Sequence, residues 1–335
     1  MKLPLASNPI LHTYPVHLNH FSIIGRNLDY EAWMFSNYIQ ISCPWDLATR
    51  PVLTIIDYHN YDMNNLYYRH SPFSREEKTE RITDRTELVS LVRKLLNEQK
   101  YLNLYLDDYY IPFRPSYNKS HEPHDLFFYG YDDDAACFHV LGYSGYGTPT
   151  ESTLSYADFE EAYINGTRLI REDYAECDWM QPDYRFEYVP AVYPLNLPHM
   201  IGLFESYLNP TTWAPMPETF LGVDVYPLLK DFYRNYTTNL IAFDVRPFHM
   251  LWEHKMLMHK RAVYLQEHLN LDLADCIASL DQLQKDYFAL RDRLIKCYFT
   301  GKKMEFERFE ETVDALLQRE IEIYRPLVGQ LKGVT

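Results

Sequence analysis

The fold is decided by residues 101–143, which read YLNLYLDDYYIPFRPSYNKSHEPHDLFFYGYDDDAACFHVLGY. Apolar and polar residues alternate from residue 102 onward, as in a strand with one buried face, until Pro112 ends the pattern. After a loop with proline and histidine residues, two apolar runs flank the acidic residues 132–134. This arrangement predicts an antiparallel hairpin, and hence an antiparallel sheet in the front half of the chain.

Helices are predicted on both sides of this segment. Residues 75–100, REEKTERITDRTELVSLVRKLLNEQK, carry an apolar stripe at helical spacing, with Thr83 or Asp84 placed to cap it. A shorter helix is expected to begin near Ser155, because serine is a favoured N-cap residue. The front half is therefore expected to mix strands and helices.

The pattern changes after residue 185. A proline-rich stretch forms a junction there, and long segments with apolar residues three and four positions apart follow it. These segments span residues 222–235, 246–269, 272–299 and 305–331. The chain is therefore predicted to be an α+β protein, with an antiparallel-sheet domain at residues 1–185 and an all-helical domain at residues 186–335.

The composition excludes several classes of protein. Hydrophobic residues make up 47% of the 335 residues, which is enough to fill a core. No apolar run reaches the roughly 18 residues that a membrane span needs. Residues 1–10 lack the basic start and apolar run of a secretory signal, so a cytoplasmic protein is expected. The five cysteines are scattered without a CxxC pair and indicate neither a disulfide framework nor a zinc site.

Neither a metal site nor a cofactor is expected from the motifs. Histidines occur at positions 249, 254 and 259, but a five-residue step does not place two of them on one helix face as a zinc pair requires. The acidic residues 132–134 lack the glycine and distal glutamate of a calcium loop. A glycine-rich phosphate loop is also missing from the sequence.

The charge and the tyrosines indicate the kind of partner. A formal net charge of −15 disfavours nucleic acid and anionic membranes, and it favours cationic partners such as amine-bearing small molecules or peptides. The thirty tyrosines are interpreted either as amphipathic packing or as the lining of a polar pocket. Tyr109, Tyr110 and Tyr143 would contribute to such a substrate-binding pocket.

The loop within residues 101–143 also supplies candidate chemistry. It brings His121, His124 and Asp125 near Asp107 and Asp108 along the sequence. A histidine at the start of a strand, facing a cleft, can act as a general base, although a nucleophile would then have to come from another part of the chain. The alternative is that His124 is a loop histidine whose ring is satisfied by backbone groups.

Residues 104–143 resemble a pattern in proteins related to butirosin biosynthesis protein H. In that pattern an aspartate-tyrosine-tyrosine-x-proline strand precedes a histidine-bearing strand and a glycine-tyrosine-aspartate turn. The matching parts here are residues 107–112, His124 and residues 130–132. The resemblance extends over residues 20–180. It implies a papain-like fold and a cysteine-histidine-aspartate triad that transfers an amino-acyl group from a carrier-protein thioester to an amine.

The triad of that family is incomplete in this sequence. The resemblance places the nucleophile at residues 20–22, His-Phe-Ser, where no cysteine stands, and the aspartate near Gly142 or Tyr143, where no aspartate stands. His124 keeps the position of the base. Ser22 could replace the thiol if a different carboxylate, such as Asp107, oriented His124, but a hydroxyl needs strong activation to attack at neutral pH.

Three hypotheses follow from the resemblance. The chain is an accessory protein of antibiotic or other non-ribosomal-peptide biosynthesis, a pseudoenzyme that binds a peptide, a carrier domain or a biosynthetic enzyme. Alternatively, it is an acyltransferase or an amide or thioester hydrolase that uses Ser22 with His124. In a variant of that second hypothesis the nucleophile is Cys43. Docking of an acidic carrier protein would require a basic patch, and the candidates are the basic residues between Arg69 and Arg85.

Overall fold

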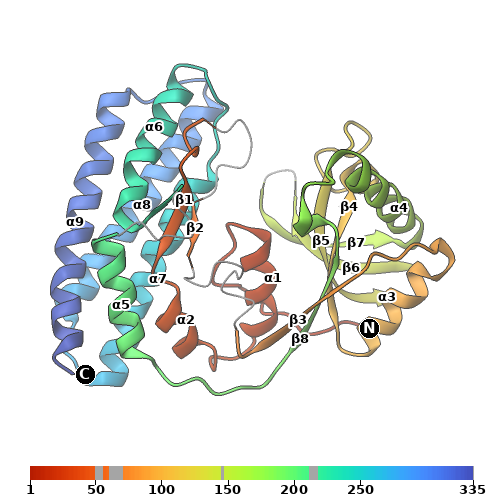
Figure 1. The fold of residues 1–335 in the computed structure, drawn as a ribbon, viewed down its shortest axis with the longest axis horizontal. Helices are drawn as coiled ribbons and strands as arrows, with labels where there is room; N and C mark the ends of the chain where they lie inside the picture. Colours follow the sequence, from red (N-terminus) through yellow and green to blue (C-terminus); the bar gives the residue numbers. More distant parts are fainter. Residues whose placement is uncertain (50–55, 60–70, 145–146, 211–217, 335) are drawn as a thin grey trace. The chain divides into compact units, whose positions relative to one another are not determined.

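The computed structural model describes residues 1–49, 56–59, 71–144, 147–210 and 218–334. The chain divides into two compact units, and each unit is built from two separate stretches of sequence. The first unit comprises residues 1–30 and 71–192, and the second comprises residues 31–70 and 193–335. Figure 1 labels the helices and most of the strands.

The first unit is organised around a six-stranded antiparallel sheet with the order β3-β8-β4-β5-β6-β7. Its strands are β3 (Ser74–Thr79), β4 (Tyr101–Asp107), β5 (Pro123–Asp132), β6 (Cys137–Tyr143), β7 (Pro149–Ser155) and β8 (Asp183–Tyr188). The β5–β6 hairpin and its acidic turn lie where the alternation of residues predicts them. The antiparallel sheet expected for the front half of the chain is thereby confirmed.

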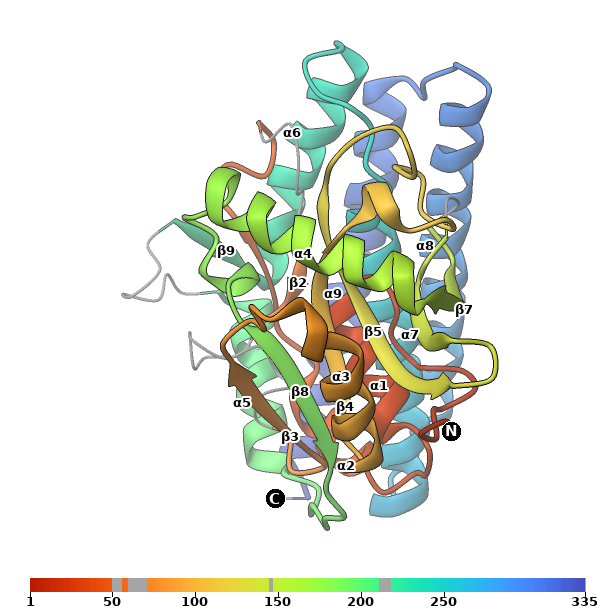
Figure 2. The same cartoon turned by 90° about the vertical axis from the view of Figure 1, so that its right-hand side faces the viewer.

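Helices cover both faces of this sheet (Figure 2). Helices α3 (Leu88–Asn97) and α4 (Tyr156–Asp173) pack on β4 and β5, where Phe128 meets Phe159 of α4 edge to face. Helix α1 (Pro15–Ile24) is tied to the opposite face, because Asn19 donates a hydrogen bond to Asn103 of β4. Side chains at alternate positions of a strand point to opposite faces, so β4 contacts α3 and α4 on one face and α1 on the other.

Two local features fix the position of α4. Ser155 caps the helix as predicted, since its hydroxyl accepts the backbone N–H of Asp158 at 3.0 Å. Gly166 allows the helix to lie directly on β4, because a Cβ atom there would be only 2.7 Å from the backbone nitrogen of Asp107. The end of β4 is therefore held in place by helix α4.

The segment 75–100 departs from the predicted helix. Its first part is strand β3, and only a one-turn 3-10 helix (Arg85–Glu87) and α3 are helical. Strand β3 lies at the edge of the sheet, paired on one side with β8. Charged residues are common on edge strands because they discourage further pairing, whereas the same residues also have good helix propensity. Pairing with β8 decides the conformation here.

The second unit consists mainly of helices, as its apolar spacing predicts. They are α2 (Glu31–Asn37), α5 (Leu197–Leu208), α6 (Val225–Thr237), α7 (Arg246–Leu269), α8 (Ala274–Phe299) and α9 (Phe306–Lys332). A small sheet of β1 (Ile41–Pro44), β2 (Asp57–Tyr58) and β9 (Thr219–Leu221) is added to them. The C-terminal part of the chain is therefore not entirely helical.

The division into units also differs from a single boundary after residue 185. Residues 31–70 group with the C-terminal helices, and the return to that unit comes at residue 193. The early segment supplies β1, whose neighbour β9 lies more than 170 positions later in the sequence.

None of the described helices combines the length and the apolar character that a membrane span requires.

The close approach of α4 to β4 gives a prediction about stability. Gly166→Ala should destabilise the protein by about 1–3 kcal/mol, because the added methyl group meets backbone atoms that cannot move aside cheaply. The measurement is thermal or urea unfolding followed by circular dichroism.

The control is Gly202→Ala in α5, where an added Cβ meets nothing within 4 Å. This change should be neutral or stabilise by about 0.5–1 kcal/mol, since alanine has the better helix propensity. If both variants unfolded alike, the proposed close contact at Gly166 would be wrong.

Candidate functional site

His124 begins a polar chain that runs across strands β4 and β5. In the sheet, His124 lies opposite Leu106 and Asp125 lies opposite Tyr105. The Nδ1 atom of His124 is 3.1 Å from a carboxylate oxygen of Asp125, and the imidazole side chain is 44% exposed. Burial disfavours the charged ring, but the hydrogen bond and the charge of Asp125 outweigh it, so the pKa of His124 is raised. His124 is thus a solvent-facing imidazole held by a buried carboxylate.

The carboxylate of Asp125 is held in turn by side chains on the face of the sheet that α1 covers. Its pKa is lowered although burial opposes ionisation, because the side chains of His124 and Asn103 bond to it and Arg114 is near. Asn103 also accepts a hydrogen bond from Asn19 of α1 at 3.2 Å. Helix α1 is therefore linked to His124 through two buried side chains.

Arg114 fixes the loop that follows β4. Its buried guanidinium donates to the backbone carbonyls of Asp125 at 2.6 Å and Tyr143 at 3.1 Å, and it lies 3.4 Å from the carboxylate of Asp108. Gly142 leaves room for it, because a Cβ atom there would approach the guanidinium to 3.2 Å. Burial raises the pKa of Asp108 even though Arg114 opposes that shift.

A second histidine–carboxylate pair lies at the end of β4. The Nδ1 atom of His121 is 2.6 Å from Asp107, whose side chain is 1% exposed, whereas the imidazole is 50% exposed. The other oxygen of Asp107 accepts the backbone N–H groups of Tyr109 and Glu122. These bonds fix the carboxylate, and the carboxylate fixes one edge of the His121 ring.

Two tyrosines complete this second pair. The rings of Tyr109 and His121 are stacked with centroids 4.3 Å apart, and Tyr110 meets Tyr109 edge to face at 5.0 Å. Burial raises the pKa of Tyr110, and the charge of Asp107 acts in the same direction. The result is an aromatic face of three rings backed by one buried carboxylate, which we call the His121 face (Asp107, Tyr109, Tyr110 and His121).

The structure pairs the predicted site residues differently from the expectation. Asp107 bonds to His121 rather than orienting His124, whose partner is Asp125. Tyr109 and Tyr110 lie together, but the hydroxyl of Tyr143 donates to the backbone carbonyl of His12 at 2.7 Å. The hydroxyl of Tyr143 is thus used in a contact with the backbone, and none of its described contacts is with Tyr109, Tyr110 or His121.

The two candidate nucleophiles are both enclosed. Ser22 lies in the last turn of α1, is 0% exposed, and its hydroxyl has no hydrogen-bond partner among the described residues. It therefore makes no hydrogen bond to His124 that could activate it. Cys43 belongs to β1 of the second unit and is 1% exposed, and burial raises the pKa of its thiol to about 12.

Most of the basic cluster proposed for carrier docking is paired or buried in the described residues. Lys78 is exposed and forms no ion pair among them, and its ammonium lies 5.7 Å from the centroid of the Tyr184 ring. Arg81 is buried, with its guanidinium bonded to Thr167 and to the carbonyl of Tyr105. The remaining described arginines of the cluster form ion pairs with acidic side chains, Arg75 with Glu187 and Arg85 with Glu160 and Glu161. Arg69 lies outside the described residues.

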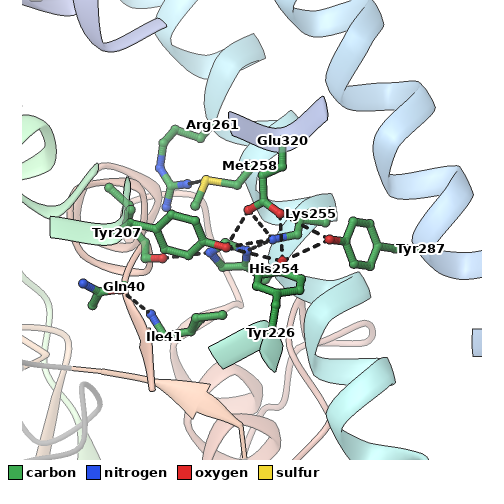
Figure 3. A network of polar contacts seen from close by, with 11 residues as sticks. Gln40, Ile41, Tyr207, Tyr226, His254, Lys255, Met258, Arg261, Tyr287 and Glu320 are labelled. Atoms are coloured by element: carbon green, nitrogen blue, oxygen red, sulfur yellow. Dashed lines mark hydrogen bonds and ion pairs between the residues drawn. The ribbon is translucent and has the colours of Figure 1, made fainter. Parts of the chain in front are cut away.

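The sequence interpretation missed a buried ionic network in the second unit (Figure 3). Lys255 of α7 and Glu320 of α9 form an ion pair at 2.5 Å, and both side chains are fully buried. Glu320 also accepts hydrogen bonds from the hydroxyls of Tyr207, Tyr226 and Tyr287. A lysine and a glutamate in otherwise apolar helical stripes were the available signal, because a charge at a core position requires a partner.

His254 links this network to the backbone of Ile39. Its Nε2 atom lies 2.8 Å from the carbonyl oxygen of Ile39 and its Nδ1 atom lies 2.9 Å from the ammonium of Lys255. A neutral ring that donates from Nε2 and accepts at Nδ1 satisfies both contacts. Burial lowers the pKa of Lys255 to about 8, although Glu320 opposes that shift. The side chains of this network are buried, and their bonds join helices α5, α6, α7, α8 and α9.

No family model matches this chain, and no curated protein sequence matches it. The chemistry of the candidate site therefore rests on its own residues, which are the His124–Asp125 pair and the His121 face.

The buried ion pair gives a prediction about stability. Lys255→Met should cost about 3–5 kcal/mol, because it leaves the charge of Glu320 buried without its cation. The double variant Lys255→Met with Glu320→Gln should lose clearly less than the sum of the two single variants. Urea unfolding of the four proteins measures this coupling.

The matched control is an ion pair near the surface of the same unit. Lys230 lies 2.9 Å from Asp314, whose side chain is largely exposed, and such pairs couple by about 0.2–1 kcal/mol. Equal coupling in the two cycles would contradict the structural role of the buried pair.

Proposed function

We propose that the chain is an accessory protein of natural-product biosynthesis, of the non-ribosomal-peptide type, with a papain-like N-terminal domain. It acts in the cytoplasm by binding an amine-bearing peptide or a biosynthetic partner, and not by transferring an acyl group through a nucleophile of its own. The binding site is the His121 face. The observation that carries this proposal is the stack of Tyr109 on His121, with the ring held by a buried Asp107.

The enclosure of the candidate nucleophiles supports binding over acyl transfer. A serine nucleophile needs a hydrogen-bonded base and access to the substrate. Ser22 is 0% exposed and has no hydrogen bond at its hydroxyl among the described residues. A thiol must ionise to attack, and the pKa of Cys43 is shifted away from neutrality.

The aromatic rings and the charge of the protein indicate the class of ligand. Tyrosine rings attract ammonium groups through their electron-rich faces. The net charge of −15 raises the local concentration of cations. A peptide or other small molecule that carries an amine satisfies both features.

A carrier domain fits the proposal less well than an amine. Carrier docking would need exposed basic side chains. Within the described part of the expected cluster, Arg81 is buried and both Arg75 and Arg85 already pair with carboxylates. Of these described residues, only Lys78 is left as an exposed cation without an ion pair. An amine-bearing ligand does not need exposed basic side chains on the protein.

The His121–Asp107 pair also favours a second candidate function, the hydrolysis of an acyl thioester or amide. A half-exposed imidazole whose Nδ1 atom is 2.6 Å from a buried carboxylate has the arrangement of a general base that activates water. This candidate needs no protein nucleophile and forms no acyl-enzyme.

One experiment distinguishes these functions. The protein is mixed with an acyl N-acetylcysteamine thioester and with a lysine-containing tripeptide. We expect no covalent adduct by intact mass and no thiol release, and we expect binding of the tripeptide that weakens about tenfold or more in Tyr109→Ala and His121→Ala. Tyr117→Ala is the control, since Tyr117 is an exposed tyrosine of the same loop.

Each alternative has its own result in this experiment. Thiol release without an adduct, lost in both His121→Asn and Asp107→Asn, would establish the hydrolase. An adduct that disappears in Ser22→Ala or in Cys43→Ala would establish acyl transfer and overturn the proposal. Equal tripeptide binding by the Tyr117→Ala and Tyr109→Ala variants would remove the His121 face as the site.

A further inference from the structure

An open hollow of about 540 Å³ lies in the first unit, separate from the residues of the His121 face. Its walls include Tyr129 of β5, His139 of β6 and Glu151 of β7, together with Lys2 and Phe113 from neighbouring loops. The hollow is shallow and wide open to solvent, so a small ligand there would stay partly exposed. Neither the proposed function nor the resemblance assigns any role to these residues.

A bulge in the sheet builds this hollow. The register between β5 and β6 shifts between Phe128 and Gly130, so that Tyr129 has no strand partner of its own. Bulges redirect side chains and often lie beside functional sites. The hydroxyl of Tyr129 reaches past β6 and donates to a carboxylate oxygen of Glu151 on β7 at 2.6 Å. Tyr129 therefore fixes the carboxylate at the wall of the hollow.

Residue 130 must be glycine for the opposite wall to form. A Cβ atom on Gly130 would be 2.5 Å from the carbonyl oxygen of Met1 and 2.9 Å from the Cα atom of Lys2. The absence of that atom lets residues 1–3 run beside β5, with the backbone N–H of Leu3 donating to the carbonyl of Tyr129. The ammonium of Lys2 is thereby brought to 6.0 Å from the centroid of the Tyr129 ring.

Lys2 and Glu151 are the charged side chains among the residues that line the hollow. Within the described residues, the two side chains form no ion pair: the ammonium of Lys2 lies over the Tyr129 ring, and Glu151 accepts a hydrogen bond from the neutral hydroxyl of Tyr129. Burial lowers the pKa of His139, and the neighbouring Lys2 and the N-terminal ammonium act in the same direction. The histidine thus adds a neutral ring rather than a third charge.

We propose that this hollow binds the zwitterion of a free α-amino acid with an apolar side chain. Glu151 would receive the ammonium group, Lys2 the carboxylate group, and Pro112 with Phe113 the side chain. Lys2 repels a ligand that is only a cation, and Glu151 repels a ligand that is only an anion. The site should therefore select the zwitterion over simple cations and simple anions. This site is independent of the proposed function of the His121 face.

The test compares three ligands that share one side chain. L-Phenylalanine is the zwitterion, L-phenylalaninamide carries only the positive charge, and N-acetyl-L-phenylalanine carries only the negative charge. Isothermal titration calorimetry in about 0.15 M salt limits the influence of the distant charges of the protein. We expect the zwitterion to bind at least about tenfold more tightly than either analogue, as the loss of one charge-assisted contact implies.

Variants of the two charged residues identify the contacts. Glu151→Gln should weaken phenylalanine about tenfold and abolish its preference over N-acetylphenylalanine, whereas Lys2→Gln should abolish the preference over phenylalaninamide. Glu98→Gln, at a half-exposed side chain on the same unit, is the matched control, and thermal unfolding verifies that each variant is folded.

Three results would overturn the proposal. They are equal binding of the three ligands, an unchanged affinity in both charge variants, and the absence of heat with phenylalanine up to about 10 mM, where a millimolar site would be occupied. If Glu151→Gln fails to fold, Tyr129→Phe replaces it, because this change removes the hydroxyl that orients Glu151. Phenylalanine should then lose affinity while the ligand order stays the same.

Discussion

The buried guanidinium of Arg114 is the contact on which the candidate site depends. It joins the carbonyl of Asp125 on β5 to the carbonyl of Tyr143 on β6, and it faces the carboxylate of Asp108 at the end of β4. A guanidinium can serve several acceptors at once because its donors are fixed in one plane. With the loop after β4 anchored in this way, His121 and His124 each face solvent on a fixed carboxylate.

The site illustrates which parts of a fold can be predicted from alternation of residues. The strand 101–107 and the hairpin around residues 132–134 were predictable, because a half-buried strand shows its period directly. The pairing of Asp107 with His121 was not, since it depends on a 3-10 turn (Asp108–Tyr110) that Asp107 caps and on the backbone bond from Asp108 to Glu122. Turn geometry of this kind leaves little trace in hydrophobic spacing.

The second unit shows the complementary case. Its long helices follow from three- and four-residue spacing, whereas the grouping of residues 31–70 with them depends on pairing of β1 with β9 across a long stretch of sequence. The apolar stripes of α7 and α9 also concealed Lys255 and Glu320, whose pairing with each other and with tyrosine hydroxyls allows two charges to be buried. The same chemistry of buried, paired charges is thus used for packing in this unit and for presenting histidines in the first.

Two separate carboxylates hold the two exposed histidines, and nuclear magnetic resonance titration of the histidine rings can verify this. His124 should have a pKa above its ordinary value, and Asp125→Asn should lower it, because the bonded carboxylate favours the charged ring. Asp107→Asn should disturb the ring signals of His121 and leave the titration of His124 unchanged. A shift of the His124 titration in Asp107→Asn, with none in Asp125→Asn, would show that Asp107 and not Asp125 holds the His124 ring.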